Sequence, residues 1–181
     1  LFFKLFLNQI ASFMGKDVFQ DSITRSAGNV IHQMANNNTL DGLIILSSGL
    51  GFYITPEELS AFCHGFTPLP TISIGEKISD IPSLLIDNRK GMWDLLHHLR
   101  DEHGYQRYAF MQGPPGNTGI QERFEVYKEF LAEQGISYDL SLVVQSPTGY
   151  LSNQNAAEEL VLREVDFDVV VAFNDLMAIS V

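Results

Sequence analysis

The apolar run at residues 169–173 limits the possible folds more than any other part of the chain, because it ends abruptly in two polar residues. Asn174 and Asp175 follow it, and helix-forming residues then resume. A short apolar run of this kind predicts a strand buried in a parallel sheet, and the polar pair predicts a helix start with Asn174 as N-cap. Such a junction faces the crevice where open α/β sheets bind ligands, so Asn174 is expected either to cap the helix or to bind a ligand.

The same alternation of apolar runs and helical patterns continues along the chain. Helix start and stop signals mark most junctions: Thr55 and Glu58 form a capping-box pattern around Pro56, and Gly104 and Gly135 each follow a helical pattern. The predicted strands are residues 43–46, 71–74, 84–86, 108–111, 142–144 and 169–173, and the predicted helices are residues 56–63, 89–103, 119–134 and 155–163.

This order predicts an α/β fold with two lobes, each containing a doubly wound, mostly parallel sheet. We place the lobe boundary at the crossover formed by Asp87 and Asn88, giving a first lobe over residues 1–87 and a second over residues 88–181. The second lobe is expected to be incomplete at its C-terminal end. The first forty residues also leave little room for a full helix and turn, so helical continuity before Asp21 is not assumed.

Composition excludes several classes of protein. The net charge is −11 and the pI about 4.7, which argues against a surface that collects phosphates from nucleic acid or an anionic membrane. Cys63 is the only cysteine, which excludes an internal disulfide and fits a cytoplasmic location. The apolar N-terminal run is interrupted by Lys4 and lacks a cleavage pattern, so neither a signal peptide nor a membrane span is expected.

Three patterns associated with catalysis or metals are weak. The loop at residues 113–119 follows a strand and precedes a helix but lacks the Gly-Lys-Ser/Thr ending of a phosphate loop. His97, His98 and His103 have neither a His-Glu-x-x-His frame nor the cysteines of a zinc site, and a partly exposed helix face is the simpler interpretation. There is no Gly-x-Ser-x-Gly elbow. We therefore expect no enzyme activity, no cofactor and no metal.

An ordered set of short motifs extends from residue 41 to residue 178. The motifs include Asp41-Gly42-Leu43-Ile44-Ile45, Ile86-Asp87-Asn88 with Gly91, His103-Gly104-Tyr105, Gly113-Pro114, Glu122-Arg123 with Tyr127, Gly135-Ile136 and Asn174-Asp175-Leu176-Met177-Ala178. Each motif is common by itself, so the resemblance is specific only because all of them occur in this order. The chain resembles, over residues 40–181, the effector-binding domain of the lactose-repressor (LacI/GalR) family, which has the type I periplasmic-binding-protein fold.

The resemblance implies a ligand-sensing domain of a transcriptional regulator. In that family two lobes close on a small metabolite, often a sugar or a nucleobase, and the hinge movement passes to an output domain. The expected partners are thus a small-molecule effector, a second copy of the chain in a homodimer through the first lobe, and DNA through a separate domain. No membrane partner is expected.

The resemblance also transfers a role to three residues. Arg123 matches the family's arginine at the start of a second-lobe helix, where a guanidinium can fork onto sugar hydroxyls or a carboxylate, although it could instead pair with Glu122 or Glu125. Asn174 matches the family's cleft asparagine, and Tyr150 corresponds approximately to an aromatic residue that stacks on ligand. Asp175 is expected to be a structural cap.

Other candidates follow from position alone. Ser47 and Ser48 come directly after a predicted strand, where hydroxyls can donate to a ligand or form a turn. Asp87 and Asn88 lie at the crossover, where a hinge role and a ligand contact are not separable by sequence. Four aromatic residues could line a pocket or belong to the core: Phe52, Tyr53, Trp93 and Phe173.

Two alternative functions use the same fold. Nothing like a helix-turn-helix precedes the sensor region, so the sensor could be fused to a signalling output such as a histidine kinase or a diguanylate cyclase. A periplasmic solute-binding receptor is the third possibility, and the lack of an export signal argues against it.

Overall fold

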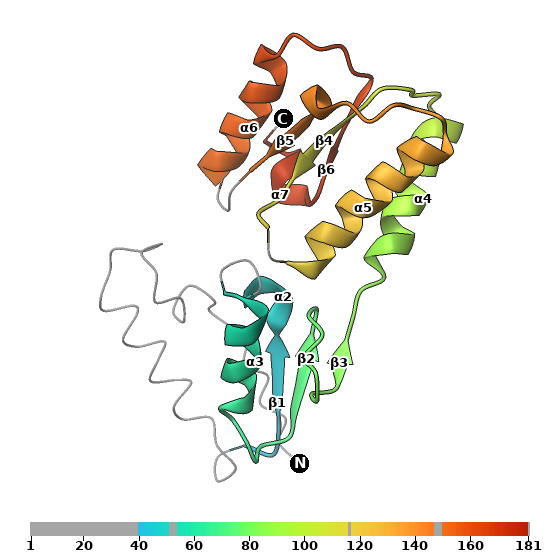
Figure 1. Cartoon of the computed structure of the whole chain (residues 1–181). Helices are drawn as coiled ribbons and strands as arrows, with labels where there is room; N and C mark the ends of the chain where they lie inside the picture. The colour runs from blue at the N-terminus through green and yellow to red at the C-terminus, as the bar shows by residue number, and fades with distance from the viewer. Residues whose placement is uncertain (1–39, 51–53, 116, 147–149, 181) are drawn as a thin grey trace. The chain divides into compact units, whose positions relative to one another are not determined.

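The chain forms two α/β units, Leu1–Ile86 and Asp87–Val181, each of which is described by itself. The structure is a computed structural model that describes residues 40–50, 54–115, 117–146 and 150–180, with the backbone alone at residues 150–152 (Figure 1). The predicted division at residues 87 and 88 lies one residue further along the chain. That the two units act as the lobes of a ligand sensor stays a prediction.

The first unit contains a parallel sheet with the strand order β1-β2-β3. The chain leaves β1 directly into α2, passes through α3 on its way to β2, and returns for β3. The elements are β1 (Leu43–Leu46), α2 (Ser47–Leu50), α3 (Pro56–His64), β2 (Thr71–Ile74) and β3 (Ser83–Leu84). Leu43 of β1 pairs with Thr71 of β2, and Ser73 of β2 pairs with Ser83 of β3.

The start of α3 confirms the predicted capping box. The hydroxyl of Thr55 accepts from the backbone N–H of Glu58 at 3.2 Å, and the Glu58 carboxylate accepts from the Thr55 N–H at 2.9 Å, with Pro56 at the first helical position. This helix packs its apolar side onto the sheet. The core of the unit comprises Leu40, Leu43, Ile45, Leu50, Leu59, Cys63, Leu69 and Ile78.

The second unit contains a parallel sheet with the strand order β5-β4-β6. Its elements are α4 (Asn88–Asp101), β4 (Tyr108–Gln112), α5 (Thr118–Glu133), β5 (Val143–Gln145), α6 (Tyr150–Leu162), β6 (Val169–Ala172) and α7 (Asp175–Ala178). Because β5 and β6 lie on opposite sides of β4, right-handed crossovers place α5 and α6 on opposite faces of the sheet. Figure 1 shows this arrangement, with α4 beside α5 on one face and α6 on the other.

The core of the second unit is rich in aromatic side chains. Tyr108, Phe110, Tyr127 and Phe130 are fully buried between β4 and the helices, and Trp93 packs against them. The Tyr127 hydroxyl donates to the Tyr108 carbonyl at 2.9 Å, which satisfies it inside the core. Gly104 and Gly135 have φ values of +72° and +67°, a conformation that favours glycine, and they end α4 and α5 as predicted.

Three boundaries differ from the sequence predictions. The predicted strand at residues 84–86 is shorter, because β3 pairs with only the end of β2 before the chain turns toward α4. The helix predicted from residue 155 begins at Tyr150, and a 3₁₀ turn over Leu140–Leu142 precedes β5. Ser47 and Ser48 are not in a turn but form the start of α2.

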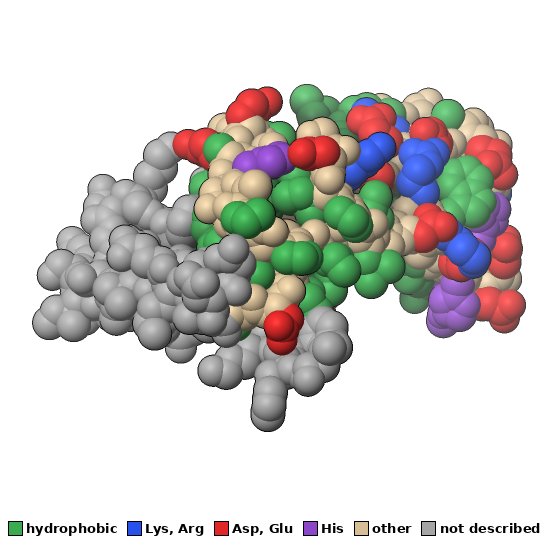
Figure 2. Space-filling model, turned by 90° about the horizontal axis from the view of Figure 1, so that it is seen from below, with side chains coloured by type: hydrophobic (Ala, Val, Ile, Leu, Met, Phe, Trp, Pro, Cys, Tyr) green, Lys and Arg blue, Asp and Glu red, His purple; other side chains and the backbone are tan. Residues whose placement is uncertain are grey.

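The described surface mixes charges of both signs. Arg89 pairs with Glu129, and Lys90 pairs with Asp94, on the helices that cover one face of the second sheet. On the face drawn in Figure 2, Lys and Arg side chains lie beside Asp and Glu side chains and form no single basic patch there. Among the described residues, no helix combines the length and the hydropathy needed to cross a membrane.

Candidate functional site

The carboxyl ends of β4 and β6 form a topological switch point within the second unit. The chain leaves β4 into α5 on one face of the sheet, whereas it leaves β6 into α7, which packs against α6 on the other face. Neighbouring parallel strands whose connections diverge in this way leave a crevice at their carboxyl ends, where ligands of open α/β sheets bind. Two of the predicted site residues, Arg123 and Asn174, lie on the elements that follow these strands.

Arg123 spans this switch point. Its Nε and Nη2 donate to the Asn88 side-chain carbonyl at 3.1 and 2.8 Å, and its Nη1 donates to the backbone carbonyl of Phe173 at the end of β6. Burial lowers the pKa of the guanidinium from its ordinary value, and the nearby Glu122 carboxylate acts in the opposite direction. The guanidinium is therefore held in one orientation by neutral acceptors, not by an ion pair.

The alternative partners of Arg123 are engaged elsewhere. Glu122 accepts from the Asn88 side-chain amide at 3.2 Å, and Glu125 pairs with Lys128 at 2.8 Å. Asn88 therefore connects Arg123 and Glu122. The sequence places Asn88 beside Asp87 at the crossover, where a hinge role and a ligand contact could not be separated, but it gave no sign that Asn88 holds Arg123.

Gly119 makes room for this arrangement. A Cβ atom there would lie 3.0 Å from the Asn88 amide nitrogen and 3.2 Å from the side-chain oxygen of Asn117. Such distances are tighter than normal contacts, so any side chain at this position would displace Asn88 or the helix start. Asn117 itself caps α5 by accepting from the Ile120 N–H at 3.1 Å. Asn117 is thus the N-cap of α5.

Asn174 caps α7 as predicted. Its side-chain oxygen accepts from the Met177 N–H at 2.8 Å, and its backbone is extended. Asp175, which we expected to be a cap, is instead the first residue of the helix. The positive end of the helix dipole stabilises a carboxylate at this position. The capping role of Asn174 is confirmed, and its contact with a ligand stays a prediction.

Phe173 is buried against the end of β4. A Cβ atom at Gly113 would lie 2.7 Å from the Phe173 Cε1, so the ring rests directly on the glycine. The side chain is part of the packing, and the carbonyl of the same residue receives Arg123. Phe173 belongs to the core, and Trp93 packs against the core cluster of the second unit.

In the first unit, Ser47 forms a closed network at the ends of β1 and β2. Its hydroxyl lies 2.6 Å from the Ser73 hydroxyl and 3.0 Å from the Ile74 carbonyl, and it accepts from the Glu76 N–H at 2.8 Å. The Ser73 hydroxyl donates to the Glu76 carbonyl at 2.7 Å. Ser47 is 0% exposed. Its hydrogen-bonding capacity is used inside the protein, so a direct ligand contact would require rearrangement.

The other predicted site residues have simpler surroundings. Asp87 is exposed and caps α4, with its carboxylate accepting from the Lys90 N–H at 2.9 Å. Ser48 lies against Gly75. Tyr150 is the first residue of α6, but its side chain is outside the described residues, as are Phe52, Tyr53 and the segment before residue 40.

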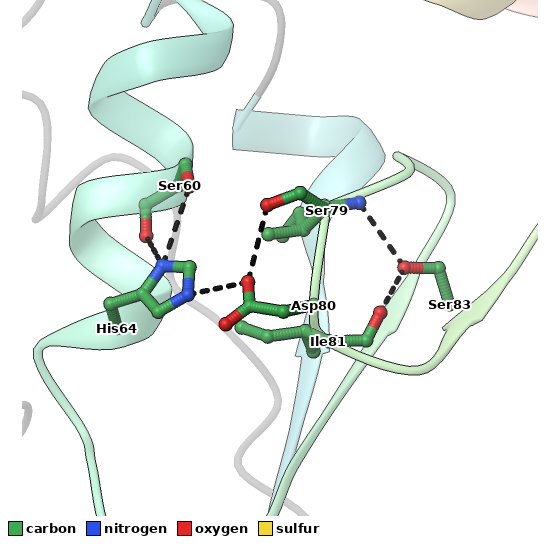
Figure 3. A network of polar contacts seen from close by, with 7 residues as sticks. Ser60, His64, Ser79, Asp80, Ile81 and Ser83 are labelled. Atoms are coloured by element: carbon green, nitrogen blue, oxygen red, sulfur yellow. Dashed lines mark hydrogen bonds and ion pairs between the residues drawn. The ribbon is translucent and has the colours of Figure 1, made fainter.

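A serine, a histidine and an aspartate also lie together at the end of α3 (Figure 3). The His64 Nε2 is 2.6 Å from the Asp80 carboxylate, and the Nδ1 is 2.6 Å from the Ser60 carbonyl but 3.3 Å from the Ser60 hydroxyl. Since the carbonyl is the nearer acceptor, Nδ1 donates to it and cannot take a proton from the hydroxyl. This group ties α3 to the loop after β2 and is not a catalytic triad.

The described residues offer little for nucleophilic or metal chemistry of the common kinds. Burial raises the pKa of the Cys63 thiol to about 11, so at neutral pH it is a protonated core residue. No group of three or more histidine, cysteine, aspartate or glutamate side chains is placed to hold a metal ion within the described part of the chain. Arg123, Asn88 and Asn174 bring hydrogen-bonding groups, not a reactive atom.

Comparison with known proteins agrees with this fold. No family model matches the chain. The chain is 25% identical over 139 residues to the HTH-type transcriptional regulator DegA of Bacillus subtilis, covering 77% of this chain and 40% of DegA. It is 37% identical over 79 residues to the HTH-type transcriptional regulator CelR of Thermobifida fusca, covering 44% of this chain and 23% of CelR.

Solved structures extend the match to most of the chain. The transcriptional regulator CelR in complex with cellobiose is 26% identical with a TM-score of 0.65, covering 88% of this chain and 47% of CelR. A LacI family transcriptional regulator from Mycobacterium smegmatis shares the fold with a TM-score of 0.65 at 22% identity, covering 78% of this chain and 50% of that regulator. The resemblance to the LacI family is confirmed. This LacI-like chain spans less than half the length of DegA and of CelR.

Proposed function

We propose that the LacI-like chain is the ligand-sensing part of a transcriptional regulator that binds a small metabolite and acts without catalysis. The observation that carries the proposal is the Arg123 guanidinium, held half-buried at a switch point by Asn88 and the Phe173 carbonyl. A guanidinium whose orientation is fixed in advance loses little rotational freedom when it binds hydroxyl or carboxylate oxygens. The relatives DegA and CelR are both regulators by name, which supports the same role.

The proposed mechanism is closure of the two units on the ligand as lobes, with Arg123 and Asn174 contacting it. A ligand that binds one lobe arrangement better than the other shifts the population toward that arrangement. The output domain then responds to the arrangement and not to the ligand itself. Ser47, Ser48, Asp87 and Tyr150 remain further proposed contacts.

We further propose a sugar as the first ligand class, with a nucleobase as the second. CelR was solved with cellobiose, and another relative is a ribose operon repressor. DNA would be read by a separate domain, since the net charge of −11 disfavours phosphate contacts by this chain. A homodimer in the cytoplasm is the state in which we propose that it works.

The experiment is a thermal-shift titration of the chain with cellobiose, ribose and adenine. A ligand that binds only the folded state raises the melting temperature. We expect at least one probe to raise it, Arg123→Ala to abolish the shift, and Arg89→Gln to keep it, because Arg89 is an exposed arginine paired with Glu129. Arg123→Lys serves as a milder second variant if Arg123→Ala lowers the melting temperature by itself. An unchanged response in both Arg123 variants would refute the site.

A further inference from the structure

The end of α4 folds back and brings two histidines together. The Glu102 N–H donates to the His98 carbonyl at 3.0 Å, and the Gly104 N–H donates to the Arg100 carbonyl at 2.9 Å. Gly104 adopts a φ of +72°, which reverses the chain direction just after His103. Helical hydrogen bonds thus continue as far as Gly104, and the His103 ring lies beside His98 of the last helical turn.

The two rings point their Nε2 atoms toward each other. The Nε2 atoms are 3.2 Å apart, the ring centroids are 4.9 Å apart and the ring planes meet at 82°. Both side chains are exposed, so ions in solution can reach them. The His103 ring also stacks on Tyr105, with centroids 5.4 Å apart and planes at 15°, which holds it in this position.

This geometry matches two ligands of one metal ion. Imidazole nitrogens bind zinc at about 2.0–2.1 Å. Two nitrogens 3.2 Å apart would both reach an ion at that distance with an N–metal–N angle of about 100°, close to tetrahedral or octahedral values. Rings aimed at such an ion would have centroids about 5 Å apart, and the observed separation is 4.9 Å.

We propose that His98 and His103 form a two-histidine site for a divalent transition-metal ion of the zinc, nickel and copper class. Imidazole nitrogen suits these ions, whereas magnesium and calcium prefer oxygen ligands. Water completes the coordination, since within the described residues no third histidine, cysteine or carboxylate joins the pair. The expectation of no metal rested on the absence of a His-Glu-x-x-His frame and of zinc-binding cysteines, and neither motif describes a histidine pair at a helix end.

The metal site is separate from the proposed ligand site. Asn88, which holds Arg123, lies at the first turn of α4, and His98 lies in its last turn. At 1.5 Å per residue the ten residues between them span about 15 Å along the helix. The failure of one proposal therefore leaves the other unaffected.

The test is isothermal titration calorimetry of the whole chain with ZnCl₂, NiCl₂ and MgCl₂. We expect the wild type to bind zinc and nickel but not magnesium. Loss of even an outer partner of a ligating histidine costs about 10–100-fold in metal affinity, so His98→Gln and His103→Gln should each weaken binding at least that much. His97→Gln is the matched control, because its ring nitrogens lie 3.6 Å from Asp101 and 4.0 Å from Glu133, outside the pair.

Three results would overturn the site. One is the absence of zinc and nickel binding by the wild type, which would leave a simple hydrogen bond between two neutral rings. Another is equal binding by all variants, which would locate the metal elsewhere in the chain. The third is a loss confined to His97→Gln. Equal melting temperatures of the metal-free variants would show that folding is not the cause of any loss.

Discussion

The strands of the two sheets are similar, but the polar groups at their carboxyl ends differ in burial and in hydrogen bonding. In the first unit, the Ser47 hydroxyl is completely buried and is satisfied by Ser73, Ile74 and Glu76. In the second unit, the Arg123 guanidinium is only half-buried and is fixed by Asn88 and Phe173. A buried, satisfied network stabilises a strand end, whereas a fixed and partly open donor group is suited to binding. The contrast teaches that position at a strand end does not by itself make a ligand contact.

We expect the largest loss of stability from a substitution at Gly75, where the first unit has no space for a side chain. A Cβ atom at Gly75 would lie 2.4 Å from the Ser48 Cβ, and the φ of +110° disfavours any side chain. We expect Gly75→Ala to lower the free energy of unfolding by about 2–5 kcal/mol, from left-handed strain and overpacking together. This loss in the free energy of unfolding is measured by urea denaturation monitored by circular dichroism.

Gly91→Ala is the matched control for that experiment. Gly91 lies within α4, and a Cβ atom there would meet nothing within 4 Å. We expect this variant to be more stable by about 0.5–1 kcal/mol, because alanine favours the helix over glycine. If both substitutions changed the free energy of unfolding equally, a methyl group at position 75 would not clash with Ser48 as the distances predict.

Removing the Ser47 hydroxyl tests whether the closed network is structural. Ser47→Ala removes the acceptor of the Glu76 N–H, while the Ser73 hydroxyl loses its contact with Ser47 but keeps its hydrogen bond to the Glu76 carbonyl. We expect a loss of about 1–3 kcal/mol in the free energy of unfolding. The exposed Ser137→Ala should stay within about 0.5 kcal/mol. If Ser47→Ala were as stable as the wild type but lost its response to a sugar, the comparison between the two strand ends would be reversed.

Two substitutions at Asn174 separate its cap from its proposed ligand contact. Asn174→Ala removes the acceptor for the Met177 N–H and should cost about 1 kcal/mol. Asn174→Asp keeps an acceptor and should keep most of the stability, yet it removes the amide donor. Thermal-shift titration should then show a weaker ligand response in Asn174→Asp. A full response in that variant would leave Asn174 as a cap alone.

The smallest effect is expected at the ion pair between His64 and Asp80 (Figure 3). The Ser60 carbonyl and the Asp80 carboxylate raise the pKa of His64, and the hydrogen bond from His64 lowers the pKa of Asp80. A histidine whose pKa is raised by folding stabilises the folded state below about pH 6.5, and this stabilisation is lost as the pH rises through the folded pKa. An aspartate whose pKa is lowered by folding stabilises the folded state at higher pH, and this stabilisation is lost as the pH falls below about 3.8.

The melting temperature of Asp80→Asn should therefore fall below that of the wild type most clearly near pH 5.5, between those limits. The difference should shrink as the pH rises through the raised pKa of His64, because the imidazole then loses its charge. A difference that stays the same across this pH range would show that the contact does not depend on the charge of His64.

The order of elements was predictable, because short apolar runs and capping residues are local signals. The Thr55 capping box, the Asn174 cap and the stops at Gly104 and Gly135 all depend on residues near each other in sequence. The partners of Arg123 were not predictable in the same way. Asn88 and Phe173 lie 35 and 50 residues away from it. The packing of α4 against α5 brings Asn88 to Arg123, and the pairing of β6 with β4 brings Phe173 there.

The same limit applies to the buried serine. A small polar residue after a strand predicts a turn, but Ser47 continues into α2 and contacts residues 26 to 29 positions away. Its burial depends on how β1 pairs with β2, which composition does not reveal. Local chemistry thus identified the candidate positions, and tertiary pairing decided which of them are satisfied within the protein.

The contact between Gly113 and the Phe173 ring links the packing of the second unit to the proposed ligand site. The ring rests on the bare backbone of β4, while the carbonyl of the same residue positions the Arg123 guanidinium and the next residue is Asn174. A single methyl group added at position 113 would push the ring outward and carry the carbonyl and the asparagine with it. Under the proposed function, a substitution at position 113 would change which effectors bind while leaving the identities of Arg123 and Asn174 unchanged.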